Sequence, residues 1–127
     1  LGMEAAGEVI EIGEDVIHEA ISRFYDRAFA DLFIGFMFVK FDKQQLIQSQ
    51  TAFASAMLGG PKLYKGKSLK KAHQKLPLKN PHFDRRQVLM REVLEELELD
   101  QKLIDQWMAL EESLRPLIIS DKGPCSS

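Results

Sequence analysis

Apolar residues recur at three- and four-residue intervals over four long stretches of the chain, which is the spacing of amphipathic helices. In the first stretch the repeat runs through Ile17, Ile21, Phe24 and Ala28. The pattern predicts helices over residues 15–30, 43–58, 82–97 and 101–118. No stretch of the sequence shows the two-residue alternation typical of a half-buried strand, so the predicted fold class is all-α.

Short signals mark where these helices begin and end. Asp42 and Asp100 stand where N-caps are expected, because a carboxylate can accept hydrogen bonds from the first free N–H groups of a helix. Asn80 is also predicted to be a cap, followed by Pro81 at the first helical position, where proline is favoured. Gly59-Gly60-Pro61 ends the second helix.

The stretches between the long helices are less regular. Residues 4–11 and 69–74 predict two short helices. Residues 31–41 are rich in phenylalanine and interrupted by Gly35, so we expect a short turn of helix within a buried loop.

The apolar face of the 43–58 helix includes one polar side chain. Its predicted inward residues are Leu46, Gln50, Phe53, Ala54 and Met57. Gln50 could meet Tyr25, which lies on the apolar stripe of the 15–30 helix, across a pocket. There a phenol can donate a hydrogen bond to a bound ligand and an amide can orient the phenol. The alternative is that both are core residues that satisfy each other or a backbone group.

The last two long helices have broad apolar faces. Their predicted inward residues are Phe83, Met90, Val93, Leu94 and Leu97 in one helix and Leu103, Ile104, Trp107, Met108, Leu114, Leu117 and Ile118 in the other. Trp107 is therefore expected in the core, whereas Glu111 and Glu112 are predicted to lie on an exposed helix face.

Composition narrows the class of protein. The 127 residues are 45% apolar and 28% charged with a net charge of −2, which fits a single globular domain over residues 1–127 with a polar tail from about residue 120. Neither nucleic acid nor an anionic membrane is favoured by this charge, and the longest apolar run, residues 28–39, is too short to span a bilayer. With a single cysteine and no secretory signal pattern, a cytoplasmic location is the default.

Two histidines flank the middle of the chain. His73 lies in a short segment between two long helices, where an axial ligand for a flat cofactor would be placed, although it could also be an ordinary surface histidine among lysines. His82 stands at a helix start, where a structural role is expected. His18 is expected to be solvated.

The series Phe24-Tyr25, Leu58-Gly59-Gly60-Pro61, Tyr64, Ala72-His73 and His82-Phe83 resembles the signature of the truncated haemoglobins, most of all their first group. The resemblance implies a two-on-two helical sandwich around haem b. It implies that His73 is the proximal ligand of the haem iron, that Tyr25 donates a hydrogen bond to a bound ligand, and that Gln50 is the distal partner of Tyr25.

The resemblance also assigns residues to the walls of the haem pocket. These are Phe38 on the haem face, Leu46 on the distal wall, Phe53 at the pocket and its ligand tunnel, Leu78 and Phe83 on the proximal side, and Tyr64 and Lys70 near the haem edge. The implied function is reversible binding of dioxygen, nitric oxide or carbon monoxide by a monomer or weak homo-oligomer. Alternatives are a nitric oxide dioxygenase that depends on an external reductase, and a haem-free helical interaction module.

Three features depart from the family pattern. The glycine pair between the first two helices is reduced to Gly13 before Glu14, and residues 75–77 lack the glycine that follows the proximal histidine segment. Arg86, three residues after Phe83, occupies a position that often holds an apolar or tryptophan side chain facing the pocket. An unpaired buried guanidinium is costly. We therefore expect Arg86 to reach a propionate or solvent, or to change the ligand chemistry.

Overall fold

The computed structural model describes residues 12–59 and 78–119, and all regular structure within these ranges is helical. The elements are α1 (Glu14–Ala30), the 3-10 helix η1 (Gly35–Phe38), α2 (Lys43–Gly59), α4 (Asn80–Glu96) and α5 (Gln101–Ile118). The all-α prediction is confirmed, and the predicted bounds of the four long helices hold to within two residues. The short helices predicted at 4–11 and 69–74 lie outside the described residues. No described helix has the length and apolarity that a membrane span requires.

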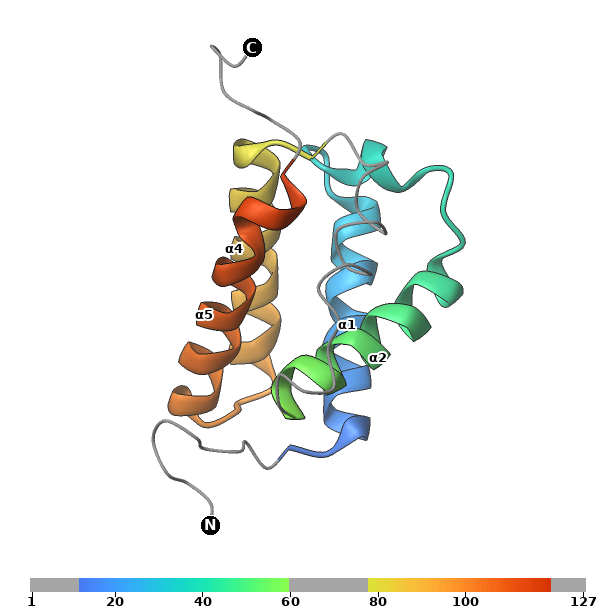
Figure 1. Cartoon of the computed structure of the whole chain (residues 1–127). Helices are drawn as coiled ribbons and strands as arrows, with labels where there is room; N and C mark the ends of the chain where they lie inside the picture. Colours follow the sequence, from blue (N-terminus) through green and yellow to red (C-terminus); the bar gives the residue numbers. More distant parts are fainter. Residues whose placement is uncertain (1–11, 60–77, 120–127) are drawn as a thin grey trace.

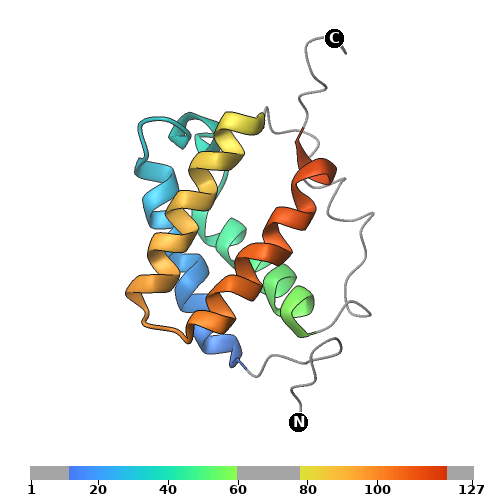
Figure 2. The ribbon, with the colours of Figure 1, turned by 90° about the vertical axis from the view of Figure 1, so that its left-hand side faces the viewer.

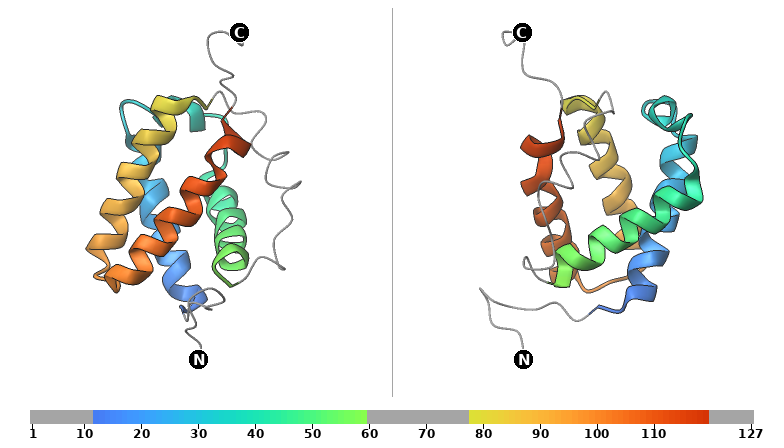
Figure 3. Two further views of the ribbon diagram at one scale, coloured as in Figure 1. Left: turned by 60° about the vertical axis from the view of Figure 1, so that its left-hand side comes forward. Right: turned by 45° about the vertical axis from the view of Figure 1, so that its right-hand side comes forward.

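The long helices form two pairs. Figure 1 shows α4 and α5 side by side, with α1 and α2 crossing each other on the opposite side of the molecule. In Figure 2 the α4–α5 pair lies in front of the α1–α2 pair, and the right-hand view of Figure 3 looks between the two. Since α1 contacts both α2 and α4, it joins the two layers.

Side chains from α1, α4 and α5 fill the space where the layers meet. Phe24, Met90, Leu94 and Trp107 are each at most 1% exposed. Burying a side chain of this size stabilises the fold by about 1.5–3 kcal/mol, so the cluster fixes α1 against the other pair. The core position predicted for Trp107 is confirmed. Leu117, predicted to be inward, is 43% exposed, because it lies about 80° around the helix from Trp107 on the side opposite to the buried Met108.

Helix α2 presents two neighbouring apolar faces, one fully buried and one partly buried against the core. Its buried residues are Ile47, Thr51, Ala54, Met57 and Leu58. Leu46, Gln50 and Phe53, predicted to face the core with Ala54 and Met57, are instead half-buried. Leu46 and Phe53 nevertheless pack against the core, so the predicted inward face is confirmed and only the depth of burial differs. Gln50 and Phe53 line the inner cavity together with Ala54 and Met57.

The segment after α1 is only partly buried. Ile34, Met37 and Phe38 are buried as expected. The prediction of a buried loop was wrong for the other apolar residues of the segment, which are exposed: Leu32, Phe33, Phe36, Val39 and Phe41. The Asp31 carboxylate holds the segment's start, where it accepts hydrogen bonds from the N–H groups of Phe33 (3.0 Å) and Ile34 (3.1 Å).

The predicted caps are largely confirmed. Asp42 accepts a hydrogen bond from the N–H of Gln45 (3.2 Å), and Asp100 accepts one from Lys102 (3.3 Å). The N-cap of α4 is Lys79, one residue before the predicted Asn80. The His82 Nδ1 accepts the Lys79 N–H (3.1 Å), which confirms the structural role expected for His82.

Candidate ligand pocket

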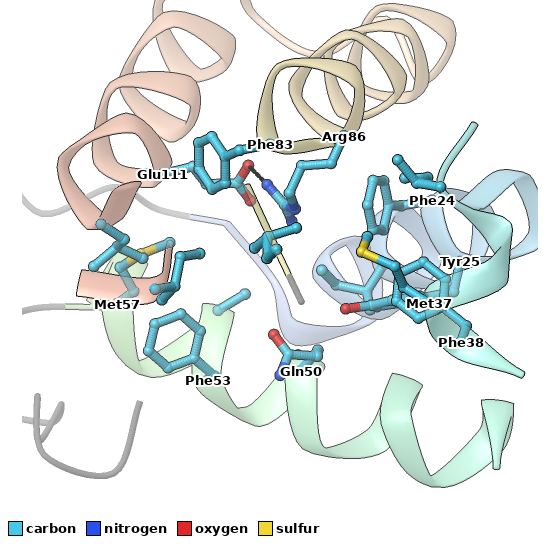
Figure 4. A pocket seen from close by; sticks show the side chains of 16 residues that line it. Phe24, Tyr25, Met37, Phe38, Gln50, Phe53, Met57, Phe83, Arg86 and Glu111 are labelled. Carbon is cyan, nitrogen blue, oxygen red and sulfur yellow. Dashed lines mark hydrogen bonds and ion pairs between the residues drawn. The ribbon is translucent and has the colours of Figure 1, made fainter. Parts of the chain in front are cut away.

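A cavity lies between the α1–α2 layer and the α4–α5 layer, and all four long helices and η1 contribute to its wall (Figure 4). The inner cavity measures about 60 Å³. A larger cleft of about 610 Å³ runs beside the start of α2. Tyr25, Phe38 and Gln50 line both spaces, so these three side chains stand between the inner cavity and the outer cleft.

Aromatic neighbours fix the Tyr25 ring. It stands edge-on to Phe24 at 4.8 Å and to Phe38 at 5.8 Å between ring centroids, and Phe38 in turn stacks on Phe29 at 5.1 Å. Offset and edge-to-face contacts of this kind contribute about 0.5–1.5 kcal/mol each beyond the area they bury. The phenol is therefore positioned by packing, and its oxygen points into the cavity (Figure 4).

The environment of Tyr25 keeps its phenol protonated. Burial raises the pKa of Tyr25 to about 12, while the nearby Arg86 charge lowers it and Glu111 raises it further. A neutral phenol inside an apolar cavity is a hydrogen-bond donor at every physiological pH. The phenol can therefore donate a hydrogen bond into the cavity, and its donation to a bound ligand stays a prediction.

Gln50 shares the cavity wall with Tyr25, and Figure 4 shows its amide reaching in from α2 on the side that the phenol faces. No hydrogen bond joins the two side chains within the described part of the chain. The predicted meeting of Tyr25 and Gln50 across a pocket is therefore seen as shared lining, while direct orientation of the phenol by the amide remains a prediction.

The other predicted pocket residues fall into three groups. Phe38, Phe53, Leu78 and Phe83 line the inner cavity, and Leu46 lines the outer cleft. Tyr64, Lys70 and His73 lie outside the described residues, so these predictions are untested. The described predictions thus converge on one place.

Neither described histidine is available to the cavity. His82 packs against Phe33 and Phe36, with ring centroids 5.3 and 5.6 Å away, while its Nδ1 serves the start of α4. His18 is exposed on α1, as expected from the sequence. An imidazole in this cavity would have to come from outside the two described ranges.

An ion pair that the sequence analysis missed lies in the cavity wall. The Arg86 Nη1 donates to Glu111 Oε1 at 2.7 Å, and the Trp107 Nε1 donates to Glu111 Oε2 at 2.9 Å. Both side chains are largely removed from solvent, at 19% exposure for Arg86 and 8% for Glu111. The expectation that Glu111 is exposed was wrong. Glu111 balances the charge of Arg86, a partner that the sequence analysis did not predict.

Aromatic rings complete the surroundings of Arg86. Its guanidinium lies 4.8 Å from the Phe24 ring centroid and 5.5 Å from that of Phe83. Positions 86 and 111 both fall on apolar stripes, with Arg86 three residues after Phe83 and Glu111 four after Trp107. Opposite charges on two stripes that face one core were a signal for a buried pair, and it was overlooked.

The sequence pattern of the family described as bacterial-like globin matches residues 11–119, which is most of the chain. The chain belongs to the bacterial-like globins. This globin is also similar to two relatives named group 1 truncated haemoglobin. The one from Tetrahymena thermophila is 31% identical over 94 residues, covering 74% of this chain and 78% of that protein. The one from Tetrahymena pyriformis is 38% identical over 72 residues, covering 57% of this chain and 60% of that protein.

Solved structures show the same arrangement of helices. The crystal structure of the Tetrahymena pyriformis truncated haemoglobin in its Fe(III) form has a TM-score of 0.76 at 30% identity, covering 86% of this chain and 93% of that one. The 2/2 haemoglobin of a Synechococcus species, in the cyanomet state with covalently attached haem, has a TM-score of 0.78 at 28% identity, covering 86% and 94%. The two-on-two sandwich implied by the resemblance is therefore the fold of this globin.

Membership of the globins implies a haem cofactor, and the chemistry of the cavity fits one. Its walls carry Phe24, Phe38, Phe53 and Phe83, which suit the apolar faces of a flat ring. Polar groups are few, as is typical of a site in which a small number of donors sets specificity.

Proposed function

We propose that this globin holds haem b between the α1–α2 and α4–α5 layers and reversibly binds dioxygen or another diatomic gas there. The observation that carries the proposal is the protonated phenol of Tyr25, fixed by three phenylalanine rings and pointing into a largely apolar cavity. Haem supplies the iron that binds the gas. The chain supplies a water-poor enclosure and a hydrogen-bond donor for the bound ligand.

We assign the axial ligand to His73. Iron in globins is held by one neutral imidazole, and the chain has three histidines. The His82 ring accepts a hydrogen bond from the Lys79 N–H at the start of α4, and His18 lies on the exposed surface of α1. Elimination among the described histidines therefore supports the assignment that the sequence resemblance implied.

Haem titration tests this assignment with a matched pair of histidine variants. Adding haem to the wild-type chain is expected to give a sharp Soret band with a defined stoichiometry. His73→Ala should lose most of this affinity or give a high-spin spectrum that added imidazole restores, whereas His82→Ala should keep the wild-type spectrum. A wild-type chain that develops no Soret band would instead support a haem-free helical module, and a His73→Ala spectrum like that of wild type would remove His73 from the iron.

The role of Tyr25 has a separate test. Replacing Tyr25 by phenylalanine keeps the ring contacts with Phe24 and Phe38 but removes the donor. Because each hydrogen bond contributes about 1 kcal/mol, a donor that acts together with Gln50 slows release of dioxygen by roughly one to two decades. Stopped-flow displacement of dioxygen by carbon monoxide measures the rate. An unchanged rate in Tyr25→Phe would show that the phenol does not contact the bound gas.

A further inference from the structure

The hydrogen bonds of Arg86 in the cavity wall involve only one nitrogen of its guanidinium. Both hydrogen bonds of its guanidinium are made by Nη1, to Glu111 Oε1 at 2.7 Å and to Gln87 Oε1 at 2.5 Å. A guanidinium carries five N–H donors. Within the described ranges, no acceptor takes the N–H groups of Nη2 or Nε, and the side chain lines the same cavity as Tyr25. Three charged donors are thus available to a ligand.

The positive end of the pair lies on the side of Tyr25. Glu111 is held from behind by the Trp107 indole, which donates to its second oxygen at 2.9 Å. At the Tyr25 phenol, Arg86 lowers the pKa by more than Glu111 raises it, so the pair's field there is positive. Figure 4 shows the guanidinium extending from α4 between Glu111 and the phenol side of the cavity.

The enclosure makes this charge effective. Hydrogen bonds that involve a charged group are about twice as strong as neutral ones, and a low dielectric strengthens them further. Carbon monoxide, which carries little charge when bound, gains little from a fixed cation, whereas a small anion gains both a hydrogen bond and a charge interaction. The residue at position 86 therefore distinguishes ligands by charge.

We propose that Arg86 makes the haem cavity of this globin selective for small monovalent anions over neutral gases, and that Glu111 limits the strength of this selection. The inference rests on the proposed function, because it concerns ligands that enter the haem cavity. It adds the class of ligand, small anions, and a ligand-selecting residue on α4.

Arg115 offers a matched control. Its guanidinium lies over the same Phe83 ring, at 4.5 Å from the centroid, but it pairs with Glu112 at 2.7 Å and Asp84 at 2.8 Å and does not line the cavity. Arg115→Met therefore removes an arginine from the same helix pair without removing a charge from the cavity. Its ligand affinities should stay within twofold of wild type.

The experiment uses haem-loaded protein and two probes, sodium azide for the ferric form and carbon monoxide for the ferrous form, each followed through the Soret band. Arg86→Met should weaken azide binding by about 10- to 100-fold, as expected for a lost charge-assisted hydrogen bond, while carbon monoxide affinity changes less than threefold. Glu111→Gln should strengthen azide binding, and Arg86→Lys should restore part of what Arg86→Met loses.

A charge-free double variant protects the test against misfolding, since Arg86→Met alone leaves a buried carboxylate. Arg86→Met with Glu111→Gln removes both charges and should still bind azide more weakly than wild type, although less weakly than Arg86→Met, because no unpaired carboxylate is left to repel the anion. Azide and carbon monoxide affinities that change in parallel across the series, or a Glu111→Gln variant with unchanged azide affinity, would overturn the inference while leaving haem binding intact. Failure of the proposed function would be detected separately, because haem titration of the wild type would then give no Soret band.

Discussion

Gly35 is the position where the described fold is least able to accept an added methyl group. A Cβ built on Gly35 would lie 2.8 Å from the carbonyl oxygen of Phe29 and 3.4 Å from that of Ala28. Both obstacles are backbone atoms in the last turn of α1, which cannot swing aside as a side chain can. Gly35→Ala must therefore move η1 away from α1, and η1 carries Met37 and Phe38 on the cavity wall.

The size of the effect follows from two opposing terms. Overpacking of a tight site costs about 1–3 kcal/mol, and the less flexible unfolded chain of an alanine variant returns about 0.4–1 kcal/mol. The net loss expected for Gly35→Ala is about 1–2 kcal/mol. For a chain of this length the loss lowers Tm by about 3–12 °C. Thermal unfolding followed by far-UV circular dichroism measures it.

Gly13 provides the control. A Cβ there would lie 2.6 Å from Asp15 Oδ1, which is the end of a flexible side chain that can rotate away. Its backbone, at a φ of −75°, suits any L-residue. Gly13→Ala loses a favoured N-cap residue but also lowers the conformational entropy of the unfolded chain, which is stabilising, so stability should change by less than about 1 kcal/mol. An unchanged Tm in Gly35→Ala, or an equal loss in both variants, would refute the reasoning.

Three further outcomes are expected. Trp107→Phe removes the indole donor to the buried Glu111 carboxylate, so urea unfolding should show a loss of about 2–4 kcal/mol; a loss below about 1 kcal/mol would mean that Glu111 has another donor. In alkaline titration at 295 nm, one tyrosine should ionise near pH 12, and Tyr25→Phe should abolish this late phase; its persistence would assign the phase to Tyr64. The Arg85 guanidinium, through its hydrogen bond, is the main cause of a lowered pKa of the Asp31 carboxyl. The ionised Asp31 carboxylate therefore contributes stability above its unfolded pKa of about 4, and this contribution is lost as pH falls through the lower folded pKa. Because Arg85→Gln lacks the contribution, its free energy of unfolding should fall less than that of wild type between neutral and acidic pH. Parallel acid-unfolding curves would contradict this last expectation.

The regular part of the fold follows from local sequence signals. The three- and four-residue repeat placed the long helices, and the cap residues Asp42 and Asp100 placed two of their starts, because both depend on interactions within about one turn of helix. The faces of α2 did not follow from the same signals. Leu46, Gln50 and Phe53 make an apolar stripe next to the one that contains Ile47 and Leu58, and only packing against α1 decides which stripe enters the core.

The two stripes of α2 also have different roles, because one stabilises the fold and the other contributes to the candidate site. The stripe with Ile47 and Leu58 is buried, whereas Leu46, Gln50 and Phe53 are half-buried and line the cavities. An apolar stripe that the protein buries only in part is therefore a sequence-level sign of a cofactor site.

The ion pair shows where such pattern rules fail. Charged residues are usually assigned to solvent, and each of Arg86 and Glu111 taken alone would be too costly to bury. The two residues lie on stripes of α4 and α5 that face the same interior. There the charge of each residue offsets the free-energy cost of burying the other. Pairing lets the fold tolerate a cation in a cavity otherwise suited to neutral ligands. The same contact that makes Arg86 compatible with folding is thus the one that sets how much of its charge a ligand meets.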